Sequence, residues 1–400
     1  MIIMELHEFC HLIRYAPVAF QRGIWYNDFL KKEGDKMKSI KQNNMESLSR
    51  HIQSLYTHPR LTYLFFELTD ACNLTCLHCG SNASPCNRTY LPLQAALDLL
   101  ESVSSCYPPQ SIMICLTGGE PMLHPGLLQI SARATELGFT CGMTTNATLI
   151  RPEMAQRLAD AGIRSVSVSL DGLQESHDWF RNSPGAFERA IQGIRALKSC
   201  TDGRIYTQIT SVIHKKNFHE LESLFQLACE LDVDSWRLVN LEPIGRALDH
   251  PELQLDRAEH LDLLKFIRKK RFSEDVSLDV TFGCSHYLTE KFEHEVRDWY
   301  YFCGAGTYIA SVLCNGDIYP CLDIERRPEL VQGNIYRDSF SDVWENKFHF
   351  FRADRSELCY QCKSCKERMF CRGDSAHTWD YNRQQPLLCL KKLFDENGGS

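Results

Sequence analysis

The chain has 400 residues, of which 44% are hydrophobic and 24% charged, and its formal net charge is −7. This length exceeds what one core usually serves, and the negative charge disfavours a general nucleic-acid or anionic-membrane surface. The length therefore favours two domains plus an extension. Because the sequence has no apolar run of membrane-span length and no signal-peptide core, we expect a cytoplasmic protein.

Residues 1–58 carry helical patterning around 20–30 and then a polar stretch, so we expect a helical N-terminal segment. From residue 59 short apolar strands alternate with amphipathic helices. The strands are expected at 62–67, 112–116, 140–144, 165–170, 205–213 and 235–239. The helices are expected at 93–103, 127–137, 152–161, 186–197, 218–231 and 257–270. Six successive strand–helix units predict a parallel sheet, either doubly wound or a partial barrel.

The remainder, residues 284–400, is rich in loops and contains nine of the 19 cysteines. Such a region builds little apolar core and needs metal ions or clusters to hold it together. An odd number of cysteines without a secretion signal favours reduced thiols, many of them metal ligands, over a set of disulfides.

Three cysteines, Cys72, Cys76 and Cys79, lie on one short loop after the first predicted strand. Three thiolates are one too few to close a tetrahedral zinc site or to give every iron of a four-iron cluster a cysteine ligand. A cluster held by these three residues keeps one iron open for a ligand that is not part of the protein.

Further polar residues follow the next strands. The turn 118–121 (Gly-Gly-Glu-Pro) ends the second strand, Asn146 follows the third, and Ser169 and Asp171 close the fourth. The glycines bring backbone amides and a carboxylate close to an amine-bearing ligand, although a plain tight turn is the alternative. Asn146 and Asp171 either cap helices or bind a ligand. Because chemistry in parallel α/β folds sits at the carboxyl ends of strands, the shared position indicates one site.

Together these motifs resemble the radical S-adenosylmethionine (radical SAM) superfamily over residues 61–280. The resemblance implies an α/β fold, a partial (β/α)6 TIM-type barrel at 59–283, and a [4Fe-4S] cluster on the three cysteines whose open iron binds S-adenosylmethionine (SAM). His78 stands where the family has an aromatic ring, and its imidazole can stack on adenine in the same way. The residues implied to contact SAM are Gly118, Gly119 and Glu120 at the methionine amine, Ser169 and Arg189 at the carboxylate or ribose, and Asn146 and Asp171.

Residues 284–400 resemble the SPASM extension, which carries auxiliary [4Fe-4S] clusters, and one or two of these are implied here. One cluster would take Cys362, Cys365, Cys371 and Cys389, for which zinc is the alternative. The other would take Cys284, Cys303, Cys321 and a cysteine four residues after Cys371. That position is Ser375, so either this cluster has an open iron, or Ser375, Cys314 or Cys359 substitutes, or the cluster is absent.

The resemblance implies an enzyme that cleaves SAM reductively to a 5′-deoxyadenosyl radical and abstracts hydrogen from a peptide or protein substrate. We expect it to install a thioether or carbon–carbon crosslink in a ribosomal peptide. Asp323 is the candidate catalytic base, although an ordinary loop carboxylate is the alternative. The expected partners are the substrate and an electron donor such as flavodoxin or ferredoxin; no nucleic acid or membrane is expected, and the protein is expected to be a monomer.

Two alternatives remain open. A sulfatase-type maturase that forms formylglycine needs the same parts, but in that class an aspartate stands beside the auxiliary cluster, and here Leu322 directly follows Cys321. A zinc-stabilised binding or scaffold protein without redox chemistry is the alternative from another class.

Overall fold

A computed structural model describes residues 34–273, 277–283, 285–293, 295–298 and 301–395. The predicted helical stretch 20–30 and the predicted ligand Cys284 lie outside these residues. No helix in the described ranges is long and apolar enough to cross a membrane.

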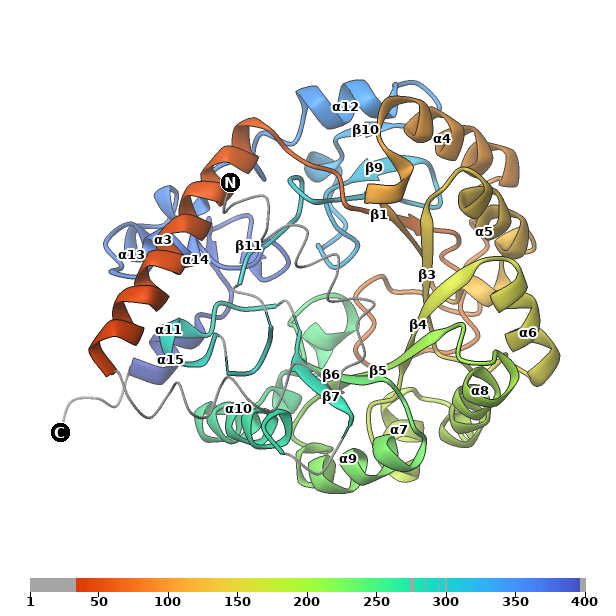
Figure 1. Ribbon diagram of the computed structural model, residues 1–400, viewed down its shortest axis with the longest axis horizontal. Coiled ribbons are helices and arrows are strands. Elements are labelled where there is room, and N and C mark those ends of the chain that lie inside the picture. The colour runs from red at the N-terminus through yellow and green to blue at the C-terminus, as the bar shows by residue number, and fades with distance from the viewer. Residues whose placement is uncertain (1–33, 274–276, 284, 294, 299–300, 396–400) are drawn as a thin grey trace.

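Seven parallel strands in chain order form a curved sheet, with helices on its outer side (Figure 1). The strands are β1 (Tyr63–Glu67), β2 (Met113–Thr117), β3 (Thr140–Thr145), β4 (Ile163–Ser169), β5 (Tyr206–Ile213), β6 (Ser235–Asn240) and β7 (Asp279–Phe282). The α/β fold with a parallel sheet is therefore confirmed, and β7 is a strand that the sequence pattern did not predict.

The helices that follow these strands pack on the outside of the sheet. They are α4 (Leu93–Cys106), α5 (Leu127–Glu136), α6 (Pro152–Asp160), α7 (Gln174–Phe180), α8 (Ala186–Cys200), α9 (Leu221–Glu230) and α10 (Arg257–Arg271). Local sequence explains several boundaries: Pro152 opens α6 without losing a needed N–H, and Asp256 and Glu259 form a capping box at the start of α10. Helix α7 is short and was not predicted.

Alternation along the strands separates an apolar outer face from a polar inner face. Val166 and Val168 of β4 are fully buried in the core beneath the helices. On the opposite face the Ser167 and Thr210 hydroxyls are 2.8 Å apart, Gln208 Nε2 donates to Ser167 Oγ at 3.1 Å, and Arg237 donates to Gln208 Oε1 at 3.0 Å. Along β4, β5 and β6 the interior of the barrel is therefore lined by a hydrogen-bonded polar network.

The C-terminal region extends the same sheet rather than forming a separate layer. Strand β8 (Ile309–Val312) pairs in parallel with β1, and β9 (Asp317–Tyr319) and β10 (Gly333–Asn334) continue the sheet in antiparallel fashion. The rest is loop-rich, as predicted, with a small sheet of β11 (Trp379–Asp380) and β12 (Gln385–Pro386). Its helices are α11 (Thr289–Phe292), α12 (Phe340–Asn346), α13 (Tyr360–Lys363), α14 (Arg368–Cys371) and α15 (Leu390–Asp395).

The first described helix, α3 (Gly34–Thr57), lies beside α14 of this C-terminal region (Figure 1). Arg372 at the end of α14 donates to the carbonyl and hydroxyl of Ser49, each at 2.9 Å, and to Gln53 Oε1 at 3.2 Å. Its guanidinium lies 5.4 Å from the centre of the Tyr56 ring. Since Arg372 directly follows the predicted ligand Cys371, α3 is anchored to a cysteine-bearing segment.

Replacing Arg372 with alanine should release α3. Hydrogen bonds from a charged donor contribute about 1.5–3 kcal/mol each when buried, so we expect the variant to be about 2–3 kcal/mol less stable. Hydrogen exchange measured by mass spectrometry should show faster exchange in residues 46–57. Arg383→Ala is the matched control, because the Arg383 side chain is 78% exposed. Unchanged protection of α3 in the Arg372 variant would contradict this anchoring role.

Candidate active site

The three cysteines of the first loop pack together at the carboxyl end of β1. Cys72 and Cys76 are buried, Cys79 is half-buried, and Leu74 and Ala83 complete the group. Each sulfur has a polar neighbour: the N–H of Leu74 donates to Cys72 Sγ at 3.4 Å, and the Ser81 hydroxyl lies 3.4 Å from Cys79 Sγ. Such contacts to sulfur are the means by which proteins tune iron–sulfur clusters.

Arg181, which the sequence analysis missed, connects this loop to Asp171. Its guanidinium donates to Cys76 Sγ at 3.6 Å and pairs with Asp171 Oδ2 at 2.5 Å. Both side chains are almost completely buried, and the N–H of Val212 donates to the other Asp171 oxygen at 2.9 Å. Because α7 was not predicted, no sequence signal placed Arg181 at its end, facing the cysteines.

A second missed residue, Arg246, holds the cysteine loop from the other side. It lies in a 3₁₀ turn after β6 and donates to the carbonyls of Cys76 at 2.7 Å and Ala83 at 3.0 Å. Gly245 beside it has φ +54°, and a Cβ there would lie 2.3 Å from the carbonyl oxygen of Cys79. Only glycine fits this close approach, which explains why a glycine stands directly before Arg246.

Burial raises the pKa of the Cys72 thiol to about 12 and also raises the pKa of Cys76, where Arg181 opposes the effect. Thiols in such surroundings stay protonated until an iron centre displaces their protons. Three thiols on one loop, with donors aimed at their sulfurs and a buried cation nearby, fit a four-iron cluster that has one iron free for SAM.

The glycines of the turn after β2 are pressed against the same loop. A Cβ on Gly119 would lie 2.2 Å from the carbonyl oxygen of Ala71, and one on Gly118, at φ +150°, would lie 2.5 Å from that of Thr69. The N–H of Gly119 donates to the carbonyl of Thr69 at 2.7 Å, and the N–H of Glu120 donates to the carbonyl of Ala71 at 2.9 Å. The amides at this turn thus hold the cysteine loop, and the contact of the glycines with SAM stays a prediction.

Glu120 is fully buried and braces the end of β3. Its carboxylate accepts hydrogen bonds from the N–H of Met122 at 3.1 Å, the hydroxyl of Thr145 at 2.7 Å and the N–H of Asn146 at 2.9 Å. Burial raises the pKa of Glu120, while these hydrogen bonds act in the opposite direction. Its interaction with the methionine amine also stays a prediction.

The other predicted SAM contacts occupy different surroundings. The Asn146 side chain donates to Asn73 Oδ1 at 2.9 Å and accepts from Thr148, which ties β3 to the cysteine loop. Ser169 is half-buried at the end of β4. Arg189, in the first turn of α8, donates to Pro184 and Ser183, and its hydrogen bonds do not reach the cysteine loop.

His78 stacks on Phe180, with ring centres 4.1 Å apart and planes 9° from parallel. Burial and the nearby Arg181 hold the pKa of His78 well below its usual value. The flat ring has the shape that stacking on adenine requires, but its contact with adenine stays a prediction.

Five cysteines, rather than four, gather in the C-terminal region. Cys359 and Cys362 bracket the first turn of α13, and Cys365 follows three residues after Cys362. Cys362 interacts with Cys359, Cys365 and Cys389, and Cys371 interacts with Cys362 and Cys389. The structure therefore places Cys359 with the predicted second auxiliary cluster and not with the first.

The predicted first auxiliary site contains Cys303, Cys321 and Ser375. Cys303 Sγ accepts a hydrogen bond from the N–H of Ala376 at 3.3 Å, and His377 and Arg355 lower the pKa of the Cys303 thiol to about 6 despite its burial. Ser375 is fully buried, and its hydroxyl accepts from the N–H of His377 at 3.3 Å. The group that completes this site stays a prediction.

Cys314 and Asp323 were also considered for this site. Cys314 lies elsewhere, and Asp323 lies at the edge of the site. The backbone N–H of Cys314 donates to Glu67 at the end of β1 at 3.3 Å, and burial together with Glu67 and Asp70 raises the pKa of this thiol to about 12. Asp323 is exposed and interacts electrostatically with His377. Its role as a catalytic base stays a prediction.

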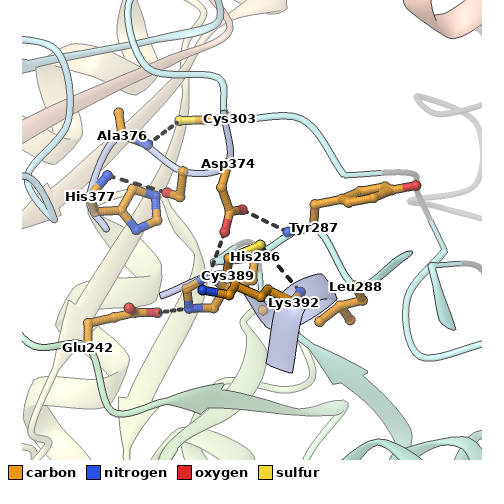
Figure 2. Close-up of polar contacts among 12 residues, drawn as sticks. Glu242, His286, Tyr287, Leu288, Cys303, Asp374, Ala376, His377, Cys389 and Lys392 are labelled. Atoms are coloured by element: carbon orange, nitrogen blue, oxygen red, sulfur yellow. Dashed lines mark hydrogen bonds and ion pairs between the residues drawn. The ribbon is translucent and has the colours of Figure 1, made fainter. Parts of the chain in front are cut away.

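A buried histidine connects the barrel to the cysteine-rich region (Figure 2). His286 Nδ1 lies 3.0 Å from Asp374 Oδ2, and its Nε2 lies 3.4 Å from Glu242 Oε1. The two carboxylates raise the pKa of His286 to about 10 despite complete burial. Because Glu242 follows β6 and Asp374 follows Cys371, this contact places auxiliary cysteines at the same end of the barrel as the first cysteine loop.

Removing Arg181 should strongly destabilise the protein, because Asp171 would be left as an unpaired buried charge. The loss expected for breaking a buried ion pair is about 3–5 kcal/mol, measured by denaturant unfolding of Arg181→Met. The double variant Asp171→Asn/Arg181→Met should recover most of this loss. Arg195→Ala on the exposed face of α8 is the control, and a double variant as unstable as the single would contradict the pairing.

The presence of five cysteines in this group leads to a prediction about iron content. A four-iron cluster has four corners, so one thiol is left over, and the sequence pattern assigns that place to Cys359. Cys359→Ser should keep the iron content of the anaerobically purified protein, whereas Cys362→Ser should lower it by about four irons per chain. Cys314→Ser is the control. Iron loss in Cys359→Ser would instead make Cys359 a ligand.

Comparison with known proteins agrees with these features. The radical SAM superfamily matches residues 66–228, and the SPASM iron-sulfur cluster-binding domain matches residues 303–366. The AdoMet-dependent heme synthase of Methanosarcina barkeri is 31% identical over 354 residues, covering 83% of this chain and 97% of the relative. The mycofactocin maturase MftC of Mycobacterium tuberculosis is 28% identical over 313 residues, covering 78% and 77%.

Solved structures show the same fold at low identity. Streptococcus suis SuiB bound to S-adenosylmethionine has a TM-score of 0.64 at 19% identity, covering 79% of this chain and 73% of that one. The structure titled native anSMEcpe with bound AdoMet and Cp18Cys peptide has a TM-score of 0.63 at 19% identity, covering 84% and 96%.

These matches include the first cysteine loop and six of the nine C-terminal cysteines, and they imply [4Fe-4S] clusters and SAM as cofactors. The alternative of a zinc-stabilised scaffold protein without redox chemistry is therefore wrong. The chain belongs to the radical SAM superfamily and is a radical SAM enzyme with a C-terminal SPASM domain.

Proposed function

We propose that this enzyme abstracts a hydrogen atom from an unactivated carbon of a ribosomally made peptide and installs a thioether or carbon–carbon crosslink. The observation that carries the proposal is the meeting of two cysteine sites at one end of the barrel. Cys72, Cys76 and Cys79 follow β1, and the contact of His286 with Glu242 and Asp374 brings the second cysteine group to the end of β6. One substrate in this region can therefore face both sites.

The balance of atoms and electrons explains why a crosslinking enzyme needs the second site. Bound SAM and its cluster supply a 5′-deoxyadenosyl radical that takes up one hydrogen atom. Forming the new bond removes a second hydrogen, which leaves as a proton and an electron. A one-electron acceptor close to the substrate is required for that electron, and the auxiliary cysteines would hold such a group.

The chain's own residues position these parts and exclude water. Arg181 places a buried positive charge beside Cys76, and Arg246 fixes the backbone of the cysteine loop. The inner face of the barrel offers uncharged donors and acceptors on Ser167, Gln208 and Thr210. Amides and carbonyls of a peptide match such groups, which supports a peptide substrate, as does the similarity to a mycofactocin maturase.

A second candidate is a porphyrin substrate, which the similarity to AdoMet-dependent heme synthases favours, since it covers 97% of one such relative. Carboxylate groups of a porphyrin would need cations, and the candidates are Arg237 on the inner face of β6 and Arg326, which pairs with Glu67 at the end of β1. The proposed peptide and this porphyrin candidate share the same radical step and differ in what occupies the barrel.

One anaerobic assay separates the two candidates. The protein, SAM and dithionite are incubated with a precursor peptide encoded beside the gene, with Fe-coproporphyrin III, or alone, and 5′-deoxyadenosine is quantified. We expect stimulation by the peptide, whose mass should fall by two hydrogens with all sulfur retained. Stimulation only by the porphyrin would replace the peptide proposal. A new aldehyde in the peptide, with loss of sulfur when a cysteine is oxidised and with sulfur retained when a serine is oxidised, would instead indicate formylglycine formation. Cys76→Ala should abolish 5′-deoxyadenosine in every arm.

A further inference from the structure

The carboxylate of Glu242, two residues beyond the end of β6, has unused capacity to accept hydrogen bonds. Both of its oxygens are shielded from solvent, and neither accepts a hydrogen bond of normal geometry from the part of the chain that the structure describes. Its ion-pair partner is His286, whose Nε2 lies 3.4 Å from Oε1. An ionised carboxylate can accept at about four positions, and a shielded polar group without such partners calls for a functional explanation.

The other buried carboxylates at this end of the barrel are already occupied. Glu67 and Asp171 each pair with an arginine, at 2.8 and 2.5 Å. Glu120 accepts three hydrogen bonds, and Asp374 accepts one from a backbone N–H besides its contact with a histidine. Of these five carboxylates, Glu242 is therefore the one whose oxygens can still take up a proton from a bound molecule.

The Glu242 carboxyl is held in its ionised form. Burial acts to raise the pKa of this group, but the positive charge of His286 outweighs burial and holds the pKa below its ordinary value, with smaller contributions from His377 and the Ser285 hydroxyl. His260 of α10 also interacts with Glu242 and His286, and burial lowers the pKa of His260. The fixed charge of His286 therefore keeps the Glu242 oxygens free of a proton until a substrate supplies one.

Glu242 lies between the two sites that the proposed reaction needs. On one side, Arg246 in the same loop after β6 donates to the carbonyl of Cys76 at 2.7 Å. On the other side, His377 interacts with both Glu242 and Cys303 of the predicted first auxiliary site (Figure 2). The Glu242 side chain is 14% exposed and its histidine partner is not exposed, so Glu242 is the member of the pair that borders open space. A substrate that reaches from the cysteine loop to the auxiliary site would pass this carboxylate.

We propose that Glu242 is the catalytic base that accepts the proton released when the crosslink forms. This inference rests on the proposed function, because the crosslink is the step that releases a proton. For a thioether, the substrate carbon radical bonds to a substrate cysteine sulfur, the S–H bond breaks, the proton goes to a Glu242 oxygen, and one electron reduces an auxiliary [4Fe-4S] cluster. For a carbon–carbon crosslink, a C–H bond breaks in place of the S–H bond, and the proton and the electron take the same routes.

Glu242→Gln tests this role, because it keeps the size of the side chain but cannot take up the proton. The complete iron-loaded protein is reacted anaerobically with dithionite, SAM and the precursor peptide under single-turnover conditions. We expect the crosslink to form about 100-fold more slowly, near the lower end of general-base contributions, while the yield of 5′-deoxyadenosine is unchanged. Freeze-quench electron paramagnetic resonance should show a longer-lived carbon radical on the peptide. Calorimetry with the unreduced protein should give an unchanged Kd for the peptide.

Two further variants accompany this test. Glu242→Asp keeps a carboxylate and should crosslink at least about tenfold faster than Glu242→Gln. Glu252→Gln is the matched control, because Glu252 also pairs with a histidine, at 3.3 Å, but its side chain is 64% exposed. The control should crosslink at the rate of the unmodified protein.

Several outcomes would overturn the role of Glu242. One is an unchanged crosslinking rate in Glu242→Gln, and another is a weaker Kd with an unchanged rate at saturating peptide, which would make Glu242 a binding residue. Loss of iron from both Glu242 variants would make the residue structural, and loss of crosslinking in Asp323→Asn instead would assign the proton to Asp323. Failure of the proposed function is distinguishable, since the unmodified protein would then leave the mass of the peptide unchanged, and the role of Glu242 would fall with it.

Discussion

The close contact between the turn after β2 and the cysteine loop after β1 is the constraint on which the active site depends. Gly118 and Gly119 have no side chain, which allows the two backbones to come into contact. The N–H groups of Gly119 and Glu120 donate hydrogen bonds to the carbonyls of Thr69 and Ala71. Two neighbouring parallel strands thereby fix a loop that has no regular structure of its own. A side chain at either glycine would move the loop and with it the three thiols.

Polar contacts extend this constraint to the third and fourth strands and to β6. Glu120 bonds to the end of β3, Asn146 bonds back to the cysteine loop, and Arg181 joins Cys76 to Asp171 after β4. A buried ion pair such as Asp171–Arg181 is weak evidence for stability, because desolvation offsets much of its attraction. Its value here lies in placing a positive charge at a thiolate site.

The SPASM domain is joined to the barrel by backbone pairing and by buried charge. Strand β8 continues the sheet next to β1, Arg326 pairs with Glu67 at 2.8 Å, and His286 bridges Glu242 and Asp374. These contacts hold the cysteine-rich loops against the strand ends that carry the first cysteine loop. The distance between the two redox sites is thus set by a rigid sheet and not by a flexible linker.

The sequence alone determined the α/β class, the six predicted helices, and the three-cysteine loop after the first strand. Periodicity reports which faces are buried, and the spacing of Cys72, Cys76 and Cys79 reports a three-thiol loop, because both signals are local in the chain. The partners of these residues are not local. Arg181 and Arg246 act on a loop about 105 and 170 residues earlier, and Cys359 joins a group that includes Cys389. Only the tertiary structure could bring such distant residues together, because their contacts depend on how strands pair and where loops end.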